Sequence, residues 1–255
     1  MSPNLVSFVS IARKESTRIF RIWVQTLVPP VITMTLYFII FGRLIGSQLR
    51  DIGGYDYMAF IAPGLIMMSI ITNSYTNTVS SFFSAKFQRN VEELLVSPTP
   101  DYIIVLGYVS GGMVRGLSVG ILVSVVSFFF TGIPLFNVGY VVLFAVLTSF
   151  VFSLAGMING IFARKFDDIS IIPTFVITPL TYLGGVFYSI SLLPDFWRLL
   201  SRVNPIIYMI DGFRFGFLGI SDIPVSTGLS MLVLFAVLLF SVNLYLLKKG
   251  IGVRS

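Results

Sequence analysis

The charged side chains with the most informative spacing lie between residues 83 and 97. Four of them recur on one face of an expected helix: Lys86, Arg89, Glu92 and Glu93. Five apolar residues occupy the opposite face: Phe83, Phe87, Val91, Leu94 and Leu95. Pro98 and Pro100 would end this helix. The pattern fits either an ordinary amphipathic connector or a surface that takes force from a soluble protein.

The chain lacks the side chains that most hydrolases and metalloenzymes use. It contains no Cys and no His, which excludes disulfides, thiolate nucleophiles and metal ligation by either residue. A serine–lysine pair remains open by composition, but no Lys falls inside a long apolar segment. No basic run or aromatic-interleaved patch of the nucleic-acid-binding kind is present. We therefore expect a protein that is not an enzyme and binds no nucleic acid.

Long uncharged stretches dominate the rest of the chain. Only 11% of residues are charged, and the mean hydropathy is +0.93. No charged residue occurs between the following pairs: Arg21 and Arg43, Asp56 and Lys86, Arg115 and Arg164, Asp168 and Asp195, and Asp222 and Lys248. A membrane-spanning helix needs about 20 apolar residues, so the third stretch has room for two spans and each of the others for one.

The expected fold is an all-α membrane protein with six transmembrane helices in a single domain, residues 1–255. The spans are expected near residues 23–42, 58–80, 102–130, 138–163, 169–189 and 226–247. Lys and Arg then divide eleven against five between the two sides. One side has residues 13, 14, 18, 21, 86, 89, 164, 165, 248, 249 and 254, and the other has 43, 50, 198, 202 and 214. Because cytoplasmic loops are enriched in Lys and Arg, both termini should be cytoplasmic.

Two further segments are apolar without being clean spans. Residues 5–21 predict an amphipathic helix whose basic face suits an anionic membrane surface, or else a simple N-terminal extension. Residues 189–225 are rich in apolar side chains but contain six charged residues. The Asn204-Pro205 pair should divide them into two short re-entrant helices. A helix lying on the external surface is the alternative.

Arg115 is a charged residue placed about halfway along the third expected span. It is flanked by glycines at 107, 111, 112, 116 and 120, a pattern that permits close helix packing. Arginine inside a membrane is costly and normally faces protein or water. It could therefore hold helices together, which we favour, or contact an anionic headgroup or substrate.

Two runs of sequence resemble a known family. Residues 89–98, RNVEELLVSP, are similar to the coupling-helix motif of type-two export permeases of ATP-binding cassette (ABC) transporters. Residues 199–208, LLSRVNPIIY, followed by Arg214, resemble the second motif of that family. The likeness extends over essentially the whole chain. Asn90-Val91 departs from the pattern, because many relatives have Gly-Thr there.

The resemblance implies a six-span subunit that works as a dimer with two ATP-binding subunits in a bacterial inner membrane. The chain has no G-x-x-x-x-G-K-[ST] phosphate loop, so ATP and Mg would be bound by the separate ATPase and no cofactor by this chain. Segment 83–97 and the N-terminal helix would dock in a groove of that ATPase. Its coupling residues would be Arg89, Glu92 and Glu93 as polar contacts, with Leu94 and Leu95 as packing anchors. Arg115, Asn204, Pro205 and Arg214 are candidates for substrate contact or packing.

The function implied is ATP-driven export of a hydrophobic or amphipathic cargo such as a lipid, glycan or drug. The alternative is an ion-coupled secondary transporter or channel without an ATPase partner. Such proteins usually carry acidic residues at mid-membrane, whereas every Asp and Glu here is expected at a membrane edge or in a loop. An intramembrane enzyme or a scaffold explains the pattern less well.

Overall fold

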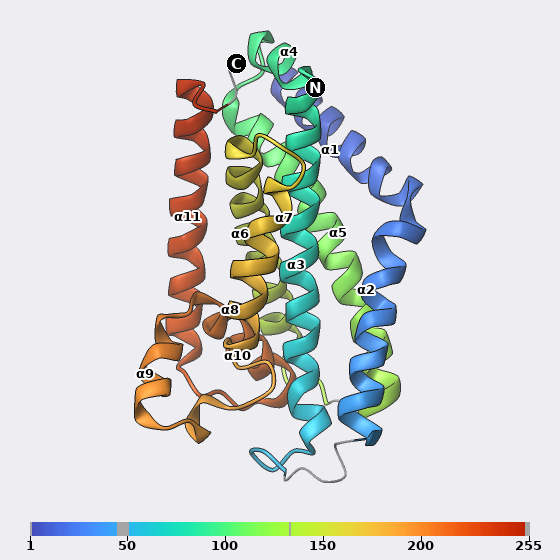
Figure 1. Cartoon of the computed structure of the whole chain (residues 1–255), viewed down its shortest axis with the longest axis vertical. Coiled ribbons are helices and arrows are strands. Elements are labelled where there is room, and N and C mark those ends of the chain that lie inside the picture. The colour runs from blue at the N-terminus through green and yellow to red at the C-terminus, as the bar shows by residue number, and fades with distance from the viewer. Residues whose placement is uncertain (1, 45–50, 133, 253–255) are drawn as a thin grey trace.

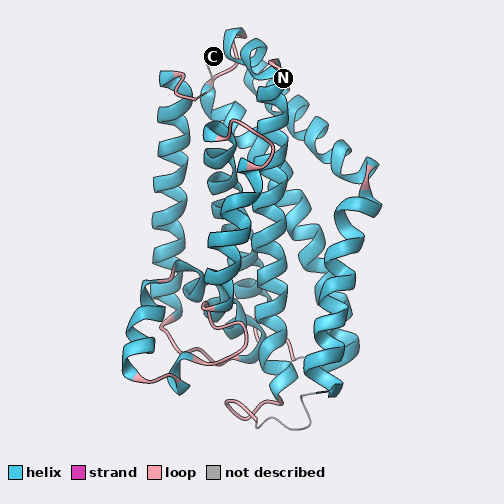
Figure 2. Ribbon diagram, in the orientation of Figure 1, coloured by secondary structure: helices cyan, strands magenta, loops and turns pink. Residues whose placement is uncertain are grey.

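The computed structural model describes residues 2–44, 51–132 and 134–252, with side chains of residues 42–44 left aside. Arg50 and Arg254, two of the residues counted for orientation, lie outside this part of the chain. All regular secondary structure in the described ranges is helical (Figure 2), apart from an isolated bridge between Ile52 and Tyr55. The all-α fold class is therefore confirmed.

Three long helices form the centre of the molecule: α3 (Tyr57–Phe87), α5 (Asp101–Thr131) and α6 (Val138–Phe162). Helix α11 (Val225–Lys249) packs on α6, and α2 (Trp23–Phe38) packs on α5 (Figure 1). Nearly all of α3 is buried, including its polar side chains. This burial makes α3 the axis around which the other helices are arranged.

Small side chains let α3 approach its neighbours closely. A Cβ atom added at Gly116 of α5 would collide with Ser74 of α3. Ser74 in turn shares a hydrogen bond of 3.0 Å with Ser149 of α6, both side chains being fully buried. Close approach and interhelical hydrogen bonds stabilise helix pairs in a membrane, where burial of apolar surface contributes little.

Five of the six expected spans are confirmed as long apolar helices. They are residues Trp23–Phe41, which join α2 to the first turn of the π-helix η1 (Ile39–Leu44), and helices α3, α5, α6 and α11. The expected span at 169–189 is instead a shorter helical path with irregular hydrogen bonding. It consists of α7 (Asp168–Ile172), the π-helix η3 (Pro173–Ile177) and α8 (Thr178–Tyr182).

Two prolines account for the irregular hydrogen bonding. Pro173 begins the π-helical stretch and Pro179 lies in the first turn of α8. Proline has no backbone N–H and clashes with the preceding turn, so the hydrogen-bond ladder shifts at each of them. The helical path ends at Tyr182 and non-helical chain follows. The described residues therefore contain five long apolar helices where the sequence predicts six.

The N-terminal helix α1 (Pro3–Arg21) forms as predicted and ends at a sharp break at Ile22. It lies obliquely across the bundle and packs on α5 (Figure 1). Ile11, Glu15 and Ile19 are its buried residues. The amphipathic pattern of α1 does not predict that Glu15 is buried together with the two isoleucines.

Segment 189–225 contains two short helices divided at Asn204-Pro205, as predicted. After the 3-10 turn η4 (Ile190–Leu192) come α9 (Asp195–Val203) and α10 (Pro205–Leu218). The two helices differ in burial. Most of α10 is buried against α3, α6 and α11, whereas α9 exposes large apolar side chains such as Phe196, Leu199 and Val203.

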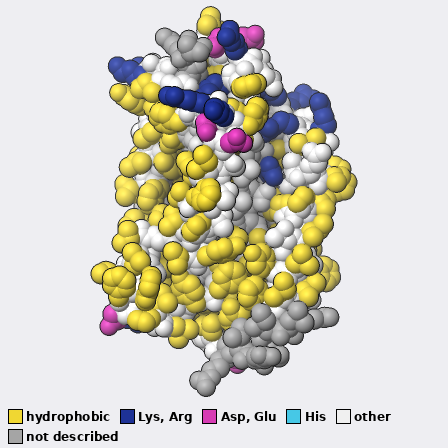
Figure 3. Space-filling view, in the orientation of Figure 1, with side chains coloured by type: hydrophobic (Ala, Val, Ile, Leu, Met, Phe, Trp, Pro, Cys, Tyr) yellow, Lys and Arg dark blue, Asp and Glu magenta, His cyan; other side chains and the backbone are white. Residues whose placement is uncertain are grey.

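One expectation is wrong: residues 83–97 do not form a single helix. Phe83 and Phe87 belong to the last turns of α3, and a separate helix α4 runs from Asn90 to Val96. Figure 1 places α4 beside both chain termini, at what we call the α4 end of the molecule; the opposite end, with loop 51–56 and α9, is the α9 end. Lys and Arg side chains gather at the α4 end and over α1 (Figure 3).

Candidate functional site

A backbone elbow at Arg89 sets the direction of α4. Arg89 has φ 62°, and it is the one non-glycine residue with positive φ in the described part of the chain. Its N–H donates to the carbonyl of Lys86 at 2.9 Å, and its own carbonyl accepts from the N–H of Glu92 at 3.1 Å. Left-handed backbone costs an L-residue about 1–2 kcal/mol. The turn persists because α3 and α4, the helices on its two sides, are both held by packing against the rest of the chain.

The exposed face of α4 carries charge. Arg89, Glu92 and Glu93 are all exposed, and neither glutamate forms a salt bridge with a described residue. Val96 at the end of the helix is 87% exposed. These four side chains form what we call the α4 face: one cation, two carboxylates that form no salt bridge with a described residue, and one apolar group.

The other side of α4 is fixed to this chain's own core. Val91 is fully buried in an apolar cluster with Ile11, Phe82 and Ile103. Leu94 and Leu95, expected as anchors for a partner, are half-buried and pack against the same cluster. Leu94 and Leu95 therefore help to attach α4 to the bundle of this chain. The exposed charged residues of α4 remain available for contact with a partner.

The start of α1 lies next to α4, as the docking prediction requires. Thr99, just after α4, donates from Oγ1 to Oγ of Ser7 at 3.4 Å. Asn4 donates from Nδ2 to the hydroxyl of Tyr102 at 3.4 Å. The segments expected to act together, α4 and the N-terminal helix, are thus brought into one surface.

Lys86, expected on the charged outer face, instead turns into the protein. Its Nζ donates to the carbonyl oxygens of Ile161 and Ala163, each at 2.6 Å. Phe166, in the loop after α6, packs edge-on between Phe83 and Phe87 with ring centroids 5.0 and 5.2 Å apart. These contacts join the end of α3 to the end of α6.

The second motif forms a structural joint at the α9 end. The Asn204 side chain accepts from the N–H of Ile206 at 3.0 Å and donates to the carbonyl of Leu180 at 2.6 Å. It therefore caps α10 and ties it to α8. Pro205 occupies the first position of α10, where its missing N–H costs nothing. Both residues stabilise packing in this arrangement.

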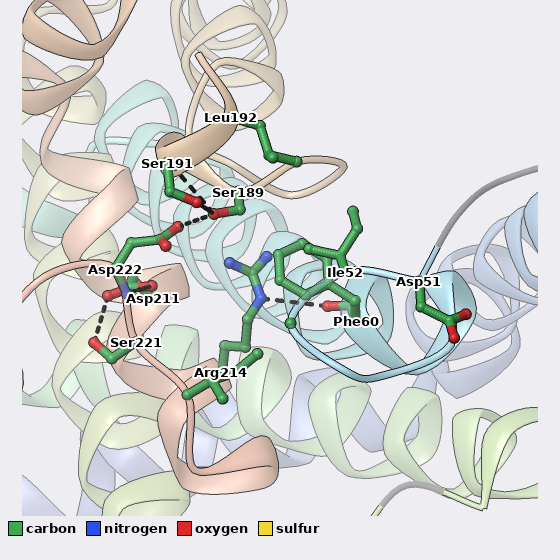
Figure 4. A pocket seen from close by; sticks show the side chains of 12 residues that line it. Asp51, Ile52, Phe60, Ser189, Ser191, Leu192, Asp211, Arg214, Ser221 and Asp222 are labelled. Atoms are coloured by element: carbon green, nitrogen blue, oxygen red, sulfur yellow. Dashed lines mark hydrogen bonds between the residues drawn. The ribbon is translucent and has the colours of Figure 1, made fainter.

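Arg214 is buried at the centre of the α9 end, with 3% exposure. Its Nε donates to the carbonyl of Phe60 at 3.3 Å and its Nη2 to that of Gly185 at 2.6 Å. The guanidinium also lies 4.0 Å from the Phe60 ring centroid. Figure 4 shows it at a cavity of about 220 Å³ between α3, α10 and the chain around residue 189.

Two aspartates organise the loop beside Arg214. The Asp211 carboxylate accepts from the Ser221 hydroxyl at 2.7 Å and from the N–H groups of Asp222 and Ile223 at 3.0 Å each. Asp222 accepts from the Ser189 hydroxyl at 2.6 Å (Figure 4). Asp211 is 3% exposed and was missed from the sequence. The one signal was its spacing of three residues from Arg214, which puts both on one face of a helix.

The buried Glu15 of α1 was also missed from the sequence. Arg115 lies on α5, the helix on which α1 packs. It forms no salt bridge with a described residue, and its Nε has no hydrogen-bond partner there. Along the sequence, Arg115 is 26 residues from Arg89 and 99 residues from Arg214. The structure separates the predicted residues into three places: the α4 face, the α9-end joint and the α1–α5 contact.

An apolar groove of about 630 Å³ opens between α8 and α9. Its lining includes Leu180, Leu183, Tyr188, Trp197, Leu200 and Val203. Within the described residues no group of three His, Cys, Asp or Glu side chains could hold a metal ion. The described residues thus present three features: the charged α4 face, the apolar groove between α8 and α9, and the buried polar contacts around Asn204 and Arg214.

Comparison with known proteins agrees with this architecture. The family model described as ABC-2 type transporter matches residues 6–218. The chain is 61% identical to the Inner membrane transport permease YadH of Escherichia coli (strain K12), over 98% of each chain. It is 24% identical to Nodulation protein J of Neorhizobium galegae, over 96% of this chain and 94% of that protein. This chain belongs to the ABC-2 type transporter family of membrane transport permeases.

Proposed function

We propose that the chain is the membrane subunit of an ATP-driven exporter in a bacterial inner membrane, energised by a separate ABC ATPase. The observation that carries this proposal is the α4 face, because Glu92 and Glu93 are exposed and have no partner in the described chain. A short charged helix held rigidly at one end of a bundle is suited to dock a soluble protein. The permease itself catalyses no reaction in this scheme.

Docking would be electrostatic in its outer contacts. Two carboxylates and one exposed valine favour a partner groove with a basic rim and an apolar floor. The first turns of α1 would complete the contact, since Ser7 and Asn4 already touch the chain around α4. ATP and Mg would be held by that partner, whose closure supplies the force.

Force applied to α4 would pass directly into the bundle. Val91 couples α4 to residues of α1, α3 and α5 in one close-packed cluster. Lys86 couples the same region to α6 through two carbonyl oxygens. Because packed interiors shift as units instead of deforming continuously, a displacement of α4 would move these helices together.

The proposed orientation puts the α4 end in the cytoplasm. Lys and Arg gather at that end (Figure 3), as expected for the cytoplasmic side of a membrane protein. Both chain termini lie there too. The irregular helix from α7 to α8 would then serve as the remaining crossing, with Pro173 and Pro179 as its bends and the α9 end outside.

The cargo proposed is hydrophobic or amphipathic, and the working unit is two permease copies with two ATPases. Support comes from the apolar groove beside Trp197 and from the exposed apolar faces of α7 to α9, for example Phe175 at 73% and Phe196 at 70% exposure. Surfaces of this kind suit lipid chains or a second apolar helix face.

The test is co-expression with candidate ABC ATPases of the same bacterium, co-purification, and ATPase assays in lipid nanodiscs. The double variant Glu92→Lys with Glu93→Lys should lose the ATPase from the complex. The matched control, Asp51→Lys with Asp195→Lys, makes the same charge change at two exposed sites of the α9 end and should retain it.

Equal retention by both double variants would refute the α4 face as the docking site. A folded wild-type chain that captures no ATPase from its own host would favour the ion-coupled alternative. Direction is then measured by following a stimulating cargo into or out of sealed vesicles with the complex in known orientation.

A further inference from the structure

A buried polar cluster joins α1, α3 and α5 and includes none of the residues of the α4 face. Glu15 of α1 is 1% exposed, and its Oε2 accepts from the Ser81 hydroxyl of α3 at 2.5 Å. The same oxygen pairs with Nη2 of Arg18 at 3.1 Å. That Nη2 also donates to Oδ1 of Asn77, on α3, at 3.1 Å.

Space for this cluster comes from Gly111 on α5. A Cβ at that position would approach the Glu15 Cβ to 2.7 Å, so any larger residue would push α1 away. Arg115 follows Gly111 by four residues and therefore lies on the same face of α5, one turn further along. The glycine thus lets α1 bring Arg18 close to the face that carries Arg115.

The cluster contains more donors than acceptors. Three buried nitrogens have no hydrogen-bond partner in the described chain: Nε of Arg18, Nδ2 of Asn77 and Nε of Arg115. Asn77 is 2% exposed, so its amide has no access to bulk water. Buried donors without partners are rare and costly. Two guanidinium groups and one carboxylate also leave a net positive charge, so an anionic acceptor is missing.

Arg18 is the member of the cluster that reaches the surface. Arg18 also lines a hollow of about 570 Å³ along α1, together with Ser10, Arg13, Lys14, Thr17 and Arg21. The side chain of Arg18 is 36% exposed. A headgroup in this hollow would meet four cationic residues, of which Arg18 also belongs to the buried cluster.

We propose that Arg18, Asn77 and Arg115 bind the phosphate of an anionic glycerophospholipid between α1, α3 and α5. Phosphate oxygens would accept from the three unpaired nitrogens, since guanidinium groups bind phosphate with strong, oriented hydrogen bonds. The acyl chains would lie against the exposed apolar start of α2, where Trp23 and Val24 are 54% and 55% exposed. Glu15 remains the acceptor for Ser81 and Arg18, holding the site open.

The test is a titration of the purified chain in detergent with phosphatidylglycerol, followed by native mass spectrometry. Arg115→Met should raise the dissociation constant of the tightest bound lipid about tenfold or more. Lys249→Gln, at an exposed position of α11 outside the hollow, should alter it by less than about twofold. Equal losses in both variants would indicate diffuse surface attraction and overturn the site.

Two further arms separate the sources of phosphate and guard against misfolding. Phosphatidylcholine should bind more weakly than phosphatidylglycerol, and inorganic phosphate binding as tightly as the lipid would overturn the lipid assignment. In the unaltered chain, phosphatidylglycerol should slow hydrogen exchange of residues 13–21 and leave residues 195–203 unchanged. Absence of that protection would contradict the proposal even if Arg115→Met failed to fold. None of these arms needs the ATPase.

Discussion

Lys86 of α3 donates from Nζ to the carbonyl oxygen of Ala163, the residue that ends α6, at 2.6 Å. The same nitrogen also binds the carbonyl of Ile161 at 2.6 Å. These carbonyls belong to the last turn of α6 and its cap, which have no partner within the helix. One ammonium group therefore satisfies a helix end and fixes two helices at the α4 end.

Replacing Lys86 by Met should lower stability. Loss of charge-assisted hydrogen bonds to two carbonyls costs about 2 kcal/mol, which is about 5 °C in the unfolding midpoint for a chain of this length. Differential scanning fluorimetry in detergent measures it. Lys165→Met, at an exposed position of the adjoining loop, should leave the midpoint within about 1 °C. Equal midpoints for both variants would contradict a stabilising role of Lys86 between α3 and α6.

The effect of a substitution at Arg89 on stability should depend on the backbone conformation that the new residue prefers more than on its charge. Glycine adopts φ 62° without strain, so Arg89→Gly should keep stability within about 1 kcal/mol of the unaltered chain. Arg89→Val should lose about 2 kcal/mol, because a β-branched residue is disfavoured there. Gln88→Val, next to the elbow but with φ −83°, is the control. An equal loss of stability for valine at positions 89 and 88 would disprove the left-handed conformation at Arg89.

Arg214→Met should destabilise the α9 end strongly. It removes two hydrogen bonds to the carbonyls of Phe60 and Gly185 and the contact with the Phe60 ring. Loss of two hydrogen bonds from a charged group to buried carbonyls costs about 3 kcal/mol. Denaturant titration followed by circular dichroism gives the value. The exposed Arg202, at the same end, provides Arg202→Met as the control, with an expected change below about 0.5 kcal/mol.

The absence of Cys from the sequence makes the proposed orientation directly testable. Glu92→Cys and Asp195→Cys place single thiols at exposed sites of opposite ends. A membrane-impermeant maleimide should label Asp195→Cys in intact spheroplasts and Glu92→Cys only after permeabilisation. The reverse pattern would invert the orientation, and labelling of both from outside would reject a spanning bundle.

Charge spacing was sufficient to locate most of the membrane helices. Uncharged stretches of the right length became α3, α5, α6, α11 and the helix that begins at Trp23. The stretch from Asp168 to Asp195 has the same length without charges, but its helical path changes to a π-helix at Pro173 and ends at Tyr182. Neighbouring helices decide whether a proline bends or interrupts a helix, so sequence spacing alone could not settle its form.

The site residues were harder to predict because their environments are tertiary. Phe83 to Leu95 keep helical spacing, yet Arg89 takes a left-handed conformation that no local glycine signals. Glu15 and Asp211 are buried with partners on distant segments. A pattern search places such carboxylates at edges or in loops, because it contains no information on which helix will cover them.

Helix α3 has 31 residues without a break, so it is about 46 Å long and exceeds a hydrocarbon core of about 30 Å. Phe60, whose carbonyl binds Arg214, and Lys86, which clamps α6, are thus two ends of one rod. Two binding events that both shift α3 must then influence each other equally. If a molecule bound near Arg214 shifts α3 and changes the affinity of α4 for its partner by some factor, that partner changes the molecule's affinity by the same factor.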